Sequence, residues 1–329
     1  MQLKGKKVLV TGAGGFIGSH LTEELVKMGC KVRAFVHYNS QNNWGNLELI
    51  SKETLKEVEI FKADITDPFA VNKAVEDREV VFHLAALIAI PYSYVAPQAY
   101  VQTNVIGTLN VMEACLKHNI EKVVHTSTSE TLGTAIYAPI DEKHPLQGQS
   151  PYSASKIGAD KIAESFFCSF KLPVATLRPF NTFGPRQSAR AVIPTIISQA
   201  LDKKEVKLGS LDPVRDLTYV KDTAAGFIAA AMSDKTVGEL VNIGNGKGIT
   251  IGELATKIIG LIDKKIPLIH DKSRMRPENS EVFKLICNNA KAKELMGWTP
   301  QHSLEDGLKA TIEFVRNNLA LFKTDHYVI

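Results

Sequence analysis

The amino-acid sequence predicts an α/β protein with a doubly wound parallel sheet and a smaller C-terminal α/β lobe. Short apolar runs rich in Val, Ile and Phe recur through the first half of the chain, as buried parallel strands do. Segments with helical spacing of apolar residues separate these runs. A glycine triplet directly follows the first run. Strands that alternate with helices in this way form a parallel sheet with helices on both faces.

The elements of the first half are predicted in order along the chain. Strands are expected at residues 6–12, 31–37, 58–64, 79–86, 121–128 and 172–181. The first helix is indicated by apolar residues that share one face, namely Phe16, Ile17, Leu21 and Leu25. A long helix is expected over residues 98–118, and another begins near Ser150. The first half therefore alternates strand and helix throughout.

The glycine triplet indicates a Rossmann dinucleotide-binding domain. Gly12, Gly15 and Gly18 follow the first strand, and Phe16 and Ile17 begin the next helix. Glycines permit a tight turn and let the backbone approach a pyrophosphate, which then lies at the helix N-terminus. The spacing is GxxGxxG rather than GxGxxG, so the strand–turn–helix context is needed to support the prediction.

Residues after later strands are expected in the same crevice. Asp64 and Ile65 follow the third strand, where Asp64 would contact the adenine amino group. The end of the fourth strand supplies three more cofactor contacts, Leu84, Ala85 and Ala86.

The end of the second strand bears on the choice between NAD and NADP. An acidic residue that would bind the ribose diol of NAD is missing there. His37, Asn39 and Ser40 could instead hold a 2′-phosphate, which favours NADP over NAD. His37 could equally be an ordinary surface residue.

The expected domain boundary lies near residue 182. Residues 1–182 would form the dinucleotide-binding domain, with strand and helix returns near 215–245, and residues 183–329 mainly a substrate lobe. In that lobe Thr250 and Glu253 have capping-box spacing. Ser303 would cap a last helix at about 304–318.

Composition excludes several classes of function. The formal net charge is only +4 and no dense basic stripe is present, so we expect no nucleic-acid partner. The four cysteines lie far apart and the histidines show no metal-binding spacing, so we expect reduced thiols and no metal. The longest apolar stretch, residues 80–90, is too short to span a bilayer, and no signal peptide is recognised. We therefore expect a cytoplasmic protein without membrane association.

Tyr152 and Lys156 form a candidate catalytic pair. They are four residues apart in the helix that begins near Ser150, so they share one helical face. A lysine cation near a phenol stabilises the phenolate, which makes a base that can take a hydroxyl proton while hydride passes to a nicotinamide.

The motifs together resemble a known family. In order along the chain they are TGAGGFIG, HLAA, STSE, YSASK, RPFNTFGPR, RDLTYVKD and MGWTP. This combination resembles the extended short-chain dehydrogenase/reductase family that acts on nucleotide-linked sugars, over essentially the whole chain. The resemblance implies a tightly bound NAD(P) that is recycled in each turnover and a nucleotide-sugar substrate. We also expect a homodimer.

Within that family, Thr128, Ser129 and Glu130 resemble the Thr-Ser-Glu pattern of GDP-mannose 4,6-dehydratases. The resemblance implies that Thr128 lies near the C4 hydroxyl, that Ser129 is a lesser partner and that Glu130 takes the C5 proton. Glucose-type dehydratases carry an Asp-Glu pair at this place. A solvated acid at the end of a strand is the alternative for Glu130.

The resemblance also implies a substrate and its contacts. The segments 85–94, 127–135 and 181–194 look most like dehydratases of legionaminic and pseudaminic acid pathways, which act on nucleotide-linked N-acetylglucosamine. The implied substrate-binding residues are Asn181, Arg186, Val192, Arg215 and Arg276. Leu132 stands where that group often has tyrosine, which leaves open a 4-keto-6-deoxy or a 5,6-ene product, and UDP or GDP as the nucleotide.

Three other functions remain open at this point. A UDP-glucuronate decarboxylase would share the Thr-Ser-Glu strand end, although the apolar residues 87–90 suit an N-acetyl sugar better than a carboxylate. A nucleotide-sugar 4-epimerase would need only the hydroxyl and the tyrosine. A non-catalytic dinucleotide sensor would need neither the Tyr152–Lys156 pair nor Glu130.

Overall fold

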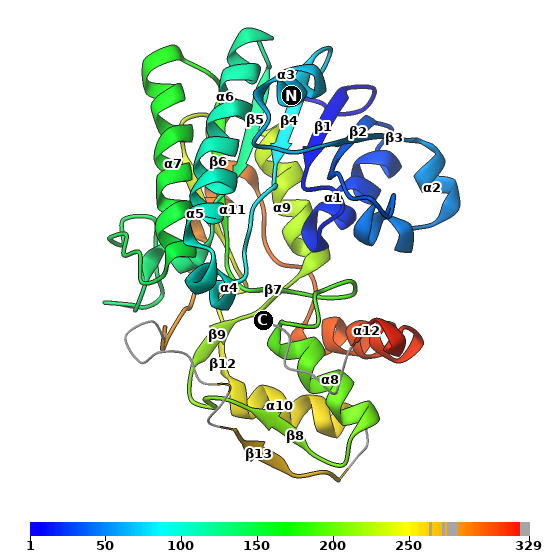
Figure 1. Ribbon diagram of the computed structural model, residues 1–329. Helices are drawn as coiled ribbons and strands as arrows, with labels where there is room; N and C mark the ends of the chain where they lie inside the picture. The colour runs from blue at the N-terminus through cyan, green and yellow to red at the C-terminus, as the bar shows by residue number, and fades with distance from the viewer. Residues whose placement is uncertain (263–264, 272–273, 275–281, 323–329) are drawn as a thin grey trace.

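A seven-stranded parallel sheet forms the centre of the molecule (Figure 1). The computed structural model describes residues 1–262, 265–271, 274 and 282–322. Across the sheet the strands are β11 (Leu240–Ile243), β6 (Val174–Pro179), β5 (Lys122–Thr126), β4 (Val80–His83), β1 (Lys7–Thr11), β2 (Lys31–His37) and β3 (Val58–Ala63). Every neighbouring pair in this sheet is parallel. The predicted doubly wound α/β fold is confirmed.

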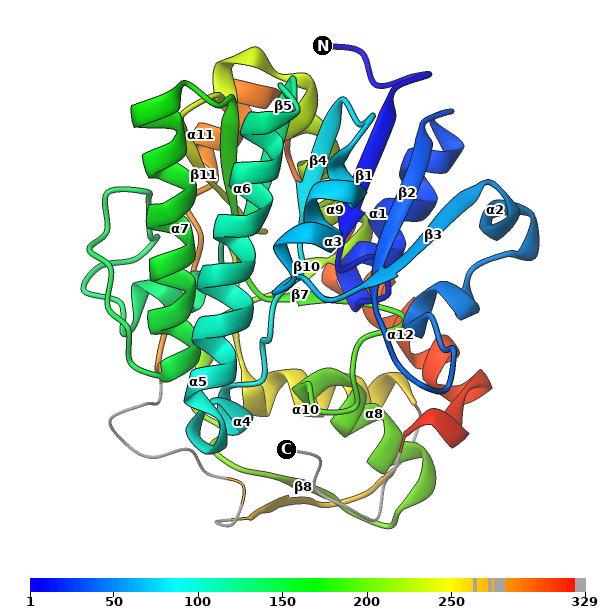
Figure 2. The ribbon, with the colours of Figure 1, turned by 45° about the horizontal axis from the view of Figure 1, so that its top comes forward.

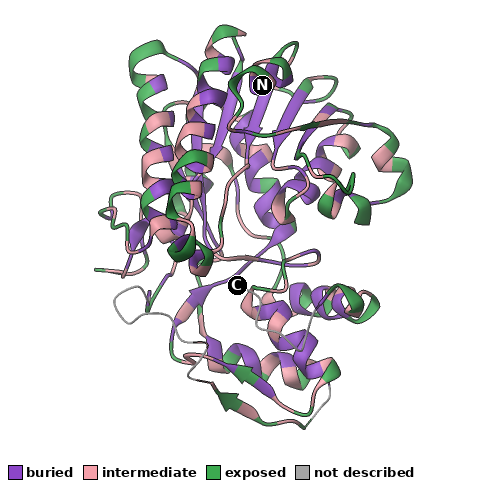
Figure 3. Cartoon of the chain, in the orientation of Figure 1, coloured by how far each residue is buried: buried purple, intermediate pink, exposed green. Residues whose placement is uncertain are grey.

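Successive side chains along each strand point to opposite faces of the sheet, so the apolar core has one part on each face. In β1, Val8 and Val10 belong to one buried cluster, whereas Leu9 between them belongs to another. The first face is covered by α1 (Phe16–Lys27) and α9 (Val220–Met232). The opposite face is covered by α3 (Pro68–Val75), α6 (Gly107–Lys117) and α7 (Pro151–Phe170) (Figure 2). Figure 3 shows the strands buried between helices whose outer surfaces are exposed.

The strand order reverses between β1 and β4, and this reversal creates the crevice in which such sheets bind ligands. From β1 the chain winds outward through β2 and β3, and from β4 it winds the other way through β5 and β6. The segments after β1 and β4 therefore diverge at the carboxyl end of the sheet. The second lobe lies beyond that end (Figure 1).

The predicted helix at 98–118 is continuous in space but irregular. It consists of α5 (Pro97–Tyr100), a π-helical turn η2 (Val101–Ile106) and α6. Within η2 the Asn104 side chain accepts a hydrogen bond from Leu87 N at 2.8 Å and donates one to Leu87 O at 3.0 Å. A widened turn of this kind is common at functional sites. Apolar spacing alone does not reveal it.

The second lobe has its own apolar core. Three helices build it, α8 (Val192–Asp202), α10 (Ile251–Leu261) and α12 (Leu304–Asn317), together with the strand pair β8 (Val206–Leu208) and β13 (Leu268–His270). The Thr250–Glu253 capping box is present at the start of α10. Ser303 caps α12 as the spacing predicts, accepting a hydrogen bond from Asp306 N.

Two short strand pairs connect the lobe to the sheet. They are β7 (Thr182–Phe183) with β10 (Thr218–Tyr219), and β9 (Val214–Asp216) with β12 (Gly248–Thr250). The sheet itself takes β11 and its cover α9 from the segment in which returns to the first domain are expected. Both elements lie within residues 215–245, and the domain division near residue 182 stays a prediction.

The remaining elements are short. They are η1 (Gly45–Leu49), α2 (Lys52–Lys56), α4 (Ile90–Val95), η3 (Ser129–Leu132), η4 (Asp234–Thr236), α11 (Ala290–Met296) and η7 (Leu319–Leu321). Among the described residues, no helix combines the length and the apolar character that crossing a bilayer requires.

Candidate active site

The glycine turn after β1 is packed so tightly that side chains are excluded. Gly12 has φ +70°, and a Cβ there would lie 2.8 Å from Ala85 N. A Cβ on Gly18 would lie 2.2 Å from the Gly12 carbonyl oxygen, and one on Gly15 would lie 3.1 Å from it. No side chain caps the N-terminus of α1, so its first N–H groups are left for an anion. This cradle fits the pyrophosphate of a dinucleotide.

A chain of buried hydrogen bonds fixes the neighbouring turn after β4. Thr108 donates to Asn104 O at 2.6 Å, so its oxygen accepts from His83 Nε2 at 3.0 Å. The other ring nitrogen of His83, Nδ1, then accepts from the Thr11 hydroxyl at 2.8 Å. Burial lowers the pKa of His83 well below its usual value, which keeps the ring neutral for this arrangement.

The Thr11 oxygen completes that chain by holding the backbone of the turn. It accepts hydrogen bonds from the N–H groups of Leu84 and Ala85, each at 3.1 Å. Leu84, Ala85 and Ala86 are all partly exposed. Thr11 and His83 thus hold the turn in shape, and the cofactor contacts of its three residues stay a prediction.

The residues expected at the adenosine end lie at the edge of the sheet. His37 is 77% exposed, and its Nε2 lies 3.5 Å from Asp64 Oδ2. Burial raises the pKa of Asp64, but hydrogen bonds from Thr66 and the nearby His37 outweigh it and hold the pKa below its ordinary value. Ser40 is exposed, whereas Ile65 is buried against Gly107. Asp64 is thus ionised and reachable at the place where an adenosine would lie.

Asn39 contributes to its own loop instead. Its amide nitrogen donates to Asn43 O at 2.7 Å, and its amide oxygen accepts from Asn43 N at 3.1 Å. The Asn39 side chain therefore closes the loop after β2, and a contact with a 2′-phosphate would have to replace these bonds.

Helix α7 carries the candidate catalytic pair into the protein. Ser150 and Ser153 form a capping box that starts the helix, with Pro151 in its first turn. Tyr152 and Lys156 are 7% and 4% exposed. The Lys156 ammonium donates to Thr126 O at 2.6 Å, which ties it to the end of β5.

Both groups are electrostatically perturbed. Burial raises the pKa of Tyr152, the Glu130 carboxylate raises it further, and the Thr128 hydroxyl opposes the change. Burial lowers the pKa of Lys156, and Asp160 opposes that change. Tyr152 is therefore a protonated phenol in the free protein, and its ionisation requires positive charge close by.

The strand-end residues divide into two that reach the site and one that does not. Thr128 caps η3, where its hydroxyl accepts from Glu130 N at 3.3 Å. Thr128 and Glu130 are partly exposed, and both influence Tyr152. Ser129 is only 2% exposed. The structure thus brings Thr128, Glu130 and Tyr152 together and turns Ser129 into the protein.

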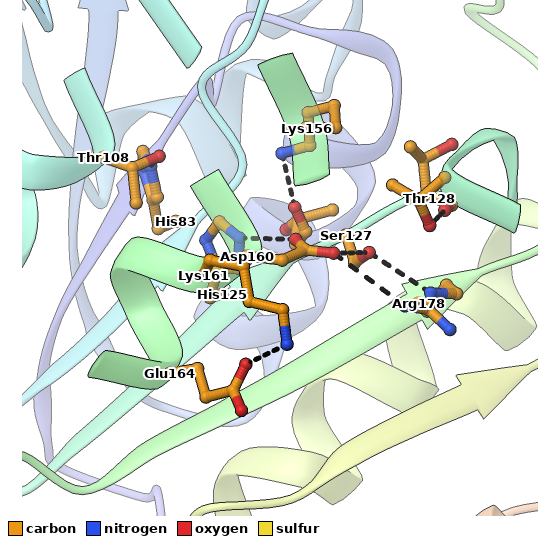
Figure 4. A network of polar contacts seen from close by, with 12 residues as sticks. His83, Thr108, His125, Ser127, Thr128, Lys156, Asp160, Lys161, Glu164 and Arg178 are labelled. Carbon is orange, nitrogen blue, oxygen red and sulfur yellow. Dashed lines mark hydrogen bonds and ion pairs between the residues drawn. The ribbon is translucent and has the colours of Figure 1, made fainter. Parts of the chain in front are cut away.

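Three charged or titratable residues behind the pair were missed by sequence reasoning. Asp160 accepts a hydrogen bond from Ser127 at 2.5 Å and lies 3.0 Å from His125 Nε2 (Figure 4). Arg178 Nη2 lies 3.9 Å from the same carboxylate. The sequence did hold a signal, because Asp160 follows Lys156 by four residues and a histidine and an arginine stand inside predicted buried strands.

The expected substrate contacts are spread over the start of the second lobe. Asn181 Oδ1 is buried without a hydrogen-bond partner among the described residues, so it is available to a ligand. Val192 begins α8 at a partly exposed position. Arg215 is buried in β9, where it donates to Val214 O at 3.2 Å. Arg276 lies outside the described residues.

Arg186, another expected substrate contact, is held by helix α1 on one side of its guanidinium. Its guanidinium donates to Glu23 and lies 2.6 Å from His20 Nδ1, both on α1. Its backbone adopts φ +68°, and its carbonyl accepts from Asn46 Nδ2 at 3.0 Å. With these contacts Arg186 links the second lobe to the dinucleotide-binding domain, while its Nη1 is buried without a hydrogen-bond partner among the described residues and is available to a ligand.

Comparison with known protein families identifies the family of the chain. The family model described as GDP-mannose 4,6 dehydratase matches residues 9–311. The chain belongs to this family. The GDP-mannose 4,6-dehydratase family lies within the extended short-chain dehydrogenases/reductases, so the chain is an enzyme of the nucleotide-sugar dehydratase and epimerase group.

Similar proteins include both dehydratases and epimerases. A putative UDP-glucose 4-epimerase of Methanocaldococcus jannaschii is 32% identical over 94% of this chain and 99% of that protein. A UDP-N-acetylglucosamine 4-epimerase from Methanobrevibacter ruminantium, solved with UDP-N-acetylmuramic acid, has a TM-score of 0.86 at 31% identity, over 96% of this chain and 99% of that one. The dTDP-glucose 4,6-dehydratase DesIV from Streptomyces venezuelae, solved with NAD, has a TM-score of 0.86 at 26% identity over the same shares.

Proposed function

We propose that the protein is an NAD(P)-dependent 4,6-dehydratase of a nucleotide-linked N-acetylglucosamine. The observation that carries the proposal is the position of Glu130, whose carboxylate acts on the pKa of Tyr152 from the end of β5. Oxidation at C4 needs only the phenol and a hydroxyl such as that of Thr128. A carboxylate beside them supplies the base that removal of the C5 proton requires. The product would enter nonulosonic-acid or related surface-glycan synthesis, as the resemblance implies.

The cofactor would be held by the glycine cradle, by Asp64 and by Lys156. Bound there, NAD(P) would supply reversible hydride transfer with the sugar. The excluded side chains at Gly12 and Gly18 support this assignment, because a pyrophosphate needs such a close backbone approach. The missing acid after β2, with His37 and Ser40 exposed there, favours NADP over NAD.

The residues of the chain would then act in sequence. Tyr152 takes the proton of the C4 hydroxyl, while Lys156 stabilises the phenolate and Thr128 positions the hydroxyl. The resulting ketone acidifies C5, and Glu130 takes that proton. Glu130 then gives the proton to the C6 hydroxyl, which leaves as water. Ser129 stands where glucose-type dehydratases carry an aspartate, so Glu130 would be the single carboxylate that serves both steps.

Two features of the product stay open within the proposal. Hydride return to C6 gives a 4-keto-6-deoxy sugar, and return to C4 gives a 5,6-ene. Leu132, which replaces a tyrosine of the similar dehydratases, is fully buried and packs with Ile140 and Phe180. The nucleotide can be UDP or GDP. The homodimer and the cytoplasmic location also remain predictions.

A direct assay tests the proposal. The purified protein is supplied with NADP or NAD and with UDP- or GDP-N-acetylglucosamine, and the products are identified by mass and by NMR. Loss of 18 mass units from the sugar, without net reduced cofactor, is the expected result. Stoichiometric accumulation of reduced cofactor would identify an ordinary dehydrogenase instead.

A nucleotide-sugar 4-epimerase is the second candidate. It is favoured by the epimerases among the similar proteins at 31–32% identity. An epimerase would invert C4 without any change of mass and without solvent deuterium at C5. The same assay in D₂O therefore separates the two functions.

A further inference from the structure

A buried charged network surrounds Asp160 and lies next to Lys156 (Figure 4). Lys156 and Asp160 are four residues apart on α7 and face the sheet, and Asp160 is only 5% exposed. A carboxylate that is removed from water must be compensated by hydrogen bonds and positive charge. His125 and Ser127 supply the hydrogen bonds, and Arg178 supplies charge from β6. Nothing in the chemistry proposed above uses Asp160.

The network fixes the strand that carries Thr128 and Glu130. His125 and Ser127 are two residues apart, so both side chains point to the face that α7 covers. Asp160 holds those two side chains, and Lys156 holds the carbonyl of Thr126 between them. Three consecutive residues of the strand end are thereby anchored to α7. The next residue along the chain is Thr128.

The network also sets the net charge of the buried groups near Tyr152. Four groups face Asp160: Lys156 of its own helix, His125 of β5, Ser127 just after β5, and Arg178 of β6. The His83 ring of β4 lies 5.6 Å from the His125 ring. Burial lowers the pKa of Arg178, and Glu142 and Cys287 oppose that change. Burial lowers the pKa of His125, so the ring is neutral, and its Nδ1 has no partner among the described residues. Two cations thus accompany one buried anion, and an ionised Tyr152 would compensate the second cation.

We propose that Asp160 is a positioning residue, which keeps Lys156 cationic beside Tyr152 and holds the end of β5 so that Thr128 and Glu130 meet the substrate. This role deepens the proposed function, because it rests on Tyr152 acting as a base. Asp160 itself touches neither sugar nor cofactor in this role. It acts through Lys156 and through the strand.

The charge part of the role is tested by titration, which needs no turnover. The holoprotein is labelled with ¹³Cζ-tyrosine, saturated with NADP or NAD, and titrated by NMR, and the Tyr152 signal is assigned by its loss in Tyr152→Phe. Removing a buried anion favours the deprotonated form of every neighbour. Asp160→Asn should therefore lower the apparent pKa values of the Tyr152–Lys156 pair by about one unit or more. Asp160→Glu, which retains the charge, should restore them.

Turnover gives a second measurement if the proposed activity is found. Both limbs of the pH profile of kcat/KM should move to lower pH in Asp160→Asn, because the acid limb reports Tyr152 and the alkaline limb reports Lys156. Ser127→Ala removes one strand contact and keeps the charge, so it should lower kcat without moving either limb. If Asp160→Asn only lowers the maximum of the kcat/KM profile and leaves both pKa values unchanged, Asp160 has a structural role alone and the proposal is wrong.

A variant that should shift the pKa values in the opposite direction keeps the test possible if Asp160→Asn does not fold. Arg178→Gln removes a cation from the same network, so it should raise the apparent pKa values of the pair, and Arg178→Lys should leave them near the wild-type values. Unchanged values in Arg178→Gln would show that the network does not act on Tyr152. A protein that titrates as expected but does not dehydrate the sugar would refute the proposed substrate chemistry and leave the role in Tyr152 ionisation standing.

Discussion

The ammonium group of Lys156 donates a hydrogen bond of 2.6 Å to the backbone carbonyl of Thr126. This contact joins the second turn of helix α7 to the end of the strand that leads to Thr128 and Glu130. Lys156 thus holds the strand in place, in addition to its expected effect on Tyr152. Substitutions at this site should accordingly affect geometry and charge together, and the predictions below pair each variant with a control that separates the two.

Tyr152→Phe should reduce kcat by about a hundredfold to ten-thousandfold, because the phenol oxygen acts in the transition state as a base. Nucleotide-sugar affinity should change little, since the ring and its packing are retained. Turnover assays and calorimetric titration measure the two quantities. Tyr137→Phe is the matched control, because that hydroxyl bonds Asp141 at an exposed position. Near-normal turnover in Tyr152→Phe would remove Tyr152 from the mechanism.

Glu130→Gln should stop the reaction after oxidation at C4. The amide keeps the shape of the side chain but cannot take the C5 proton, so reduced cofactor should remain bound after substrate is added. Absorbance at the reduced-nicotinamide band and deuterium exchange at C5 follow the two steps. Glu164→Gln is the control, since Glu164 pairs with Lys161 on the exposed side of α7. Wild-type deuterium incorporation at C5 in Glu130→Gln would place the base elsewhere.

Gly18→Ala should impair cofactor binding and stability together. Its Cβ would lie 2.2 Å from the Gly12 carbonyl oxygen, so the turn and α1 would have to separate, at a cost of about 1–3 kcal/mol. Denaturant unfolding and cofactor titration measure the two effects. Gly260→Ala is the control, because nothing lies within 4 Å of its Cβ in helix α10. That variant should be neutral or stabilised by up to ~1 kcal/mol. Unimpaired cofactor affinity in Gly18→Ala would contradict the cradle.

His20 should make folding stability sensitive to acid. Burial, aided by Arg186, lowers its pKa from 6.5 to about 3. In the native state the ring therefore stays neutral while the unfolded chain takes up a proton below pH 6.5. Its contribution to stability is complete above pH 6.5 and is lost as the pH falls toward 3.

The size of this loss can be measured with one variant. Between pH 7 and pH 5 the wild type should lose ~2 kcal/mol of unfolding free energy through this histidine alone. Urea unfolding of His20→Gln at the two pH values should show a loss smaller by that amount. Equal losses in both proteins would mean that His20 is protonated in the native state, and its arrangement with Pro185 and Arg186 would need revision.

The sequence by itself determined the features that depend on neighbours in the chain. The period of the apolar runs located the strands of the first half, because a strand buried on both faces needs apolar residues at nearly every position. The glycine spacing located the tight turn after β1, since only glycine tolerates the close approach at positions 12 and 18. The four-residue interval between Tyr152 and Lys156 put both on one helical face. The helix caps at Thr250 and Ser303 could be predicted because each depends on a residue only three positions further along the chain.

Only the tertiary structure decided which distant groups meet. Arg186 pairs with α1, more than a hundred and fifty residues earlier in the chain, although its motif suggested a phosphate ligand. Ser129 is turned inward while its neighbours on either side reach the site. Asp160 finds its partners on two different strands. These outcomes follow because each buried charge and polar group needs a partner. The available partners depend on packing across the sheet and between the lobes, which local sequence patterns do not encode.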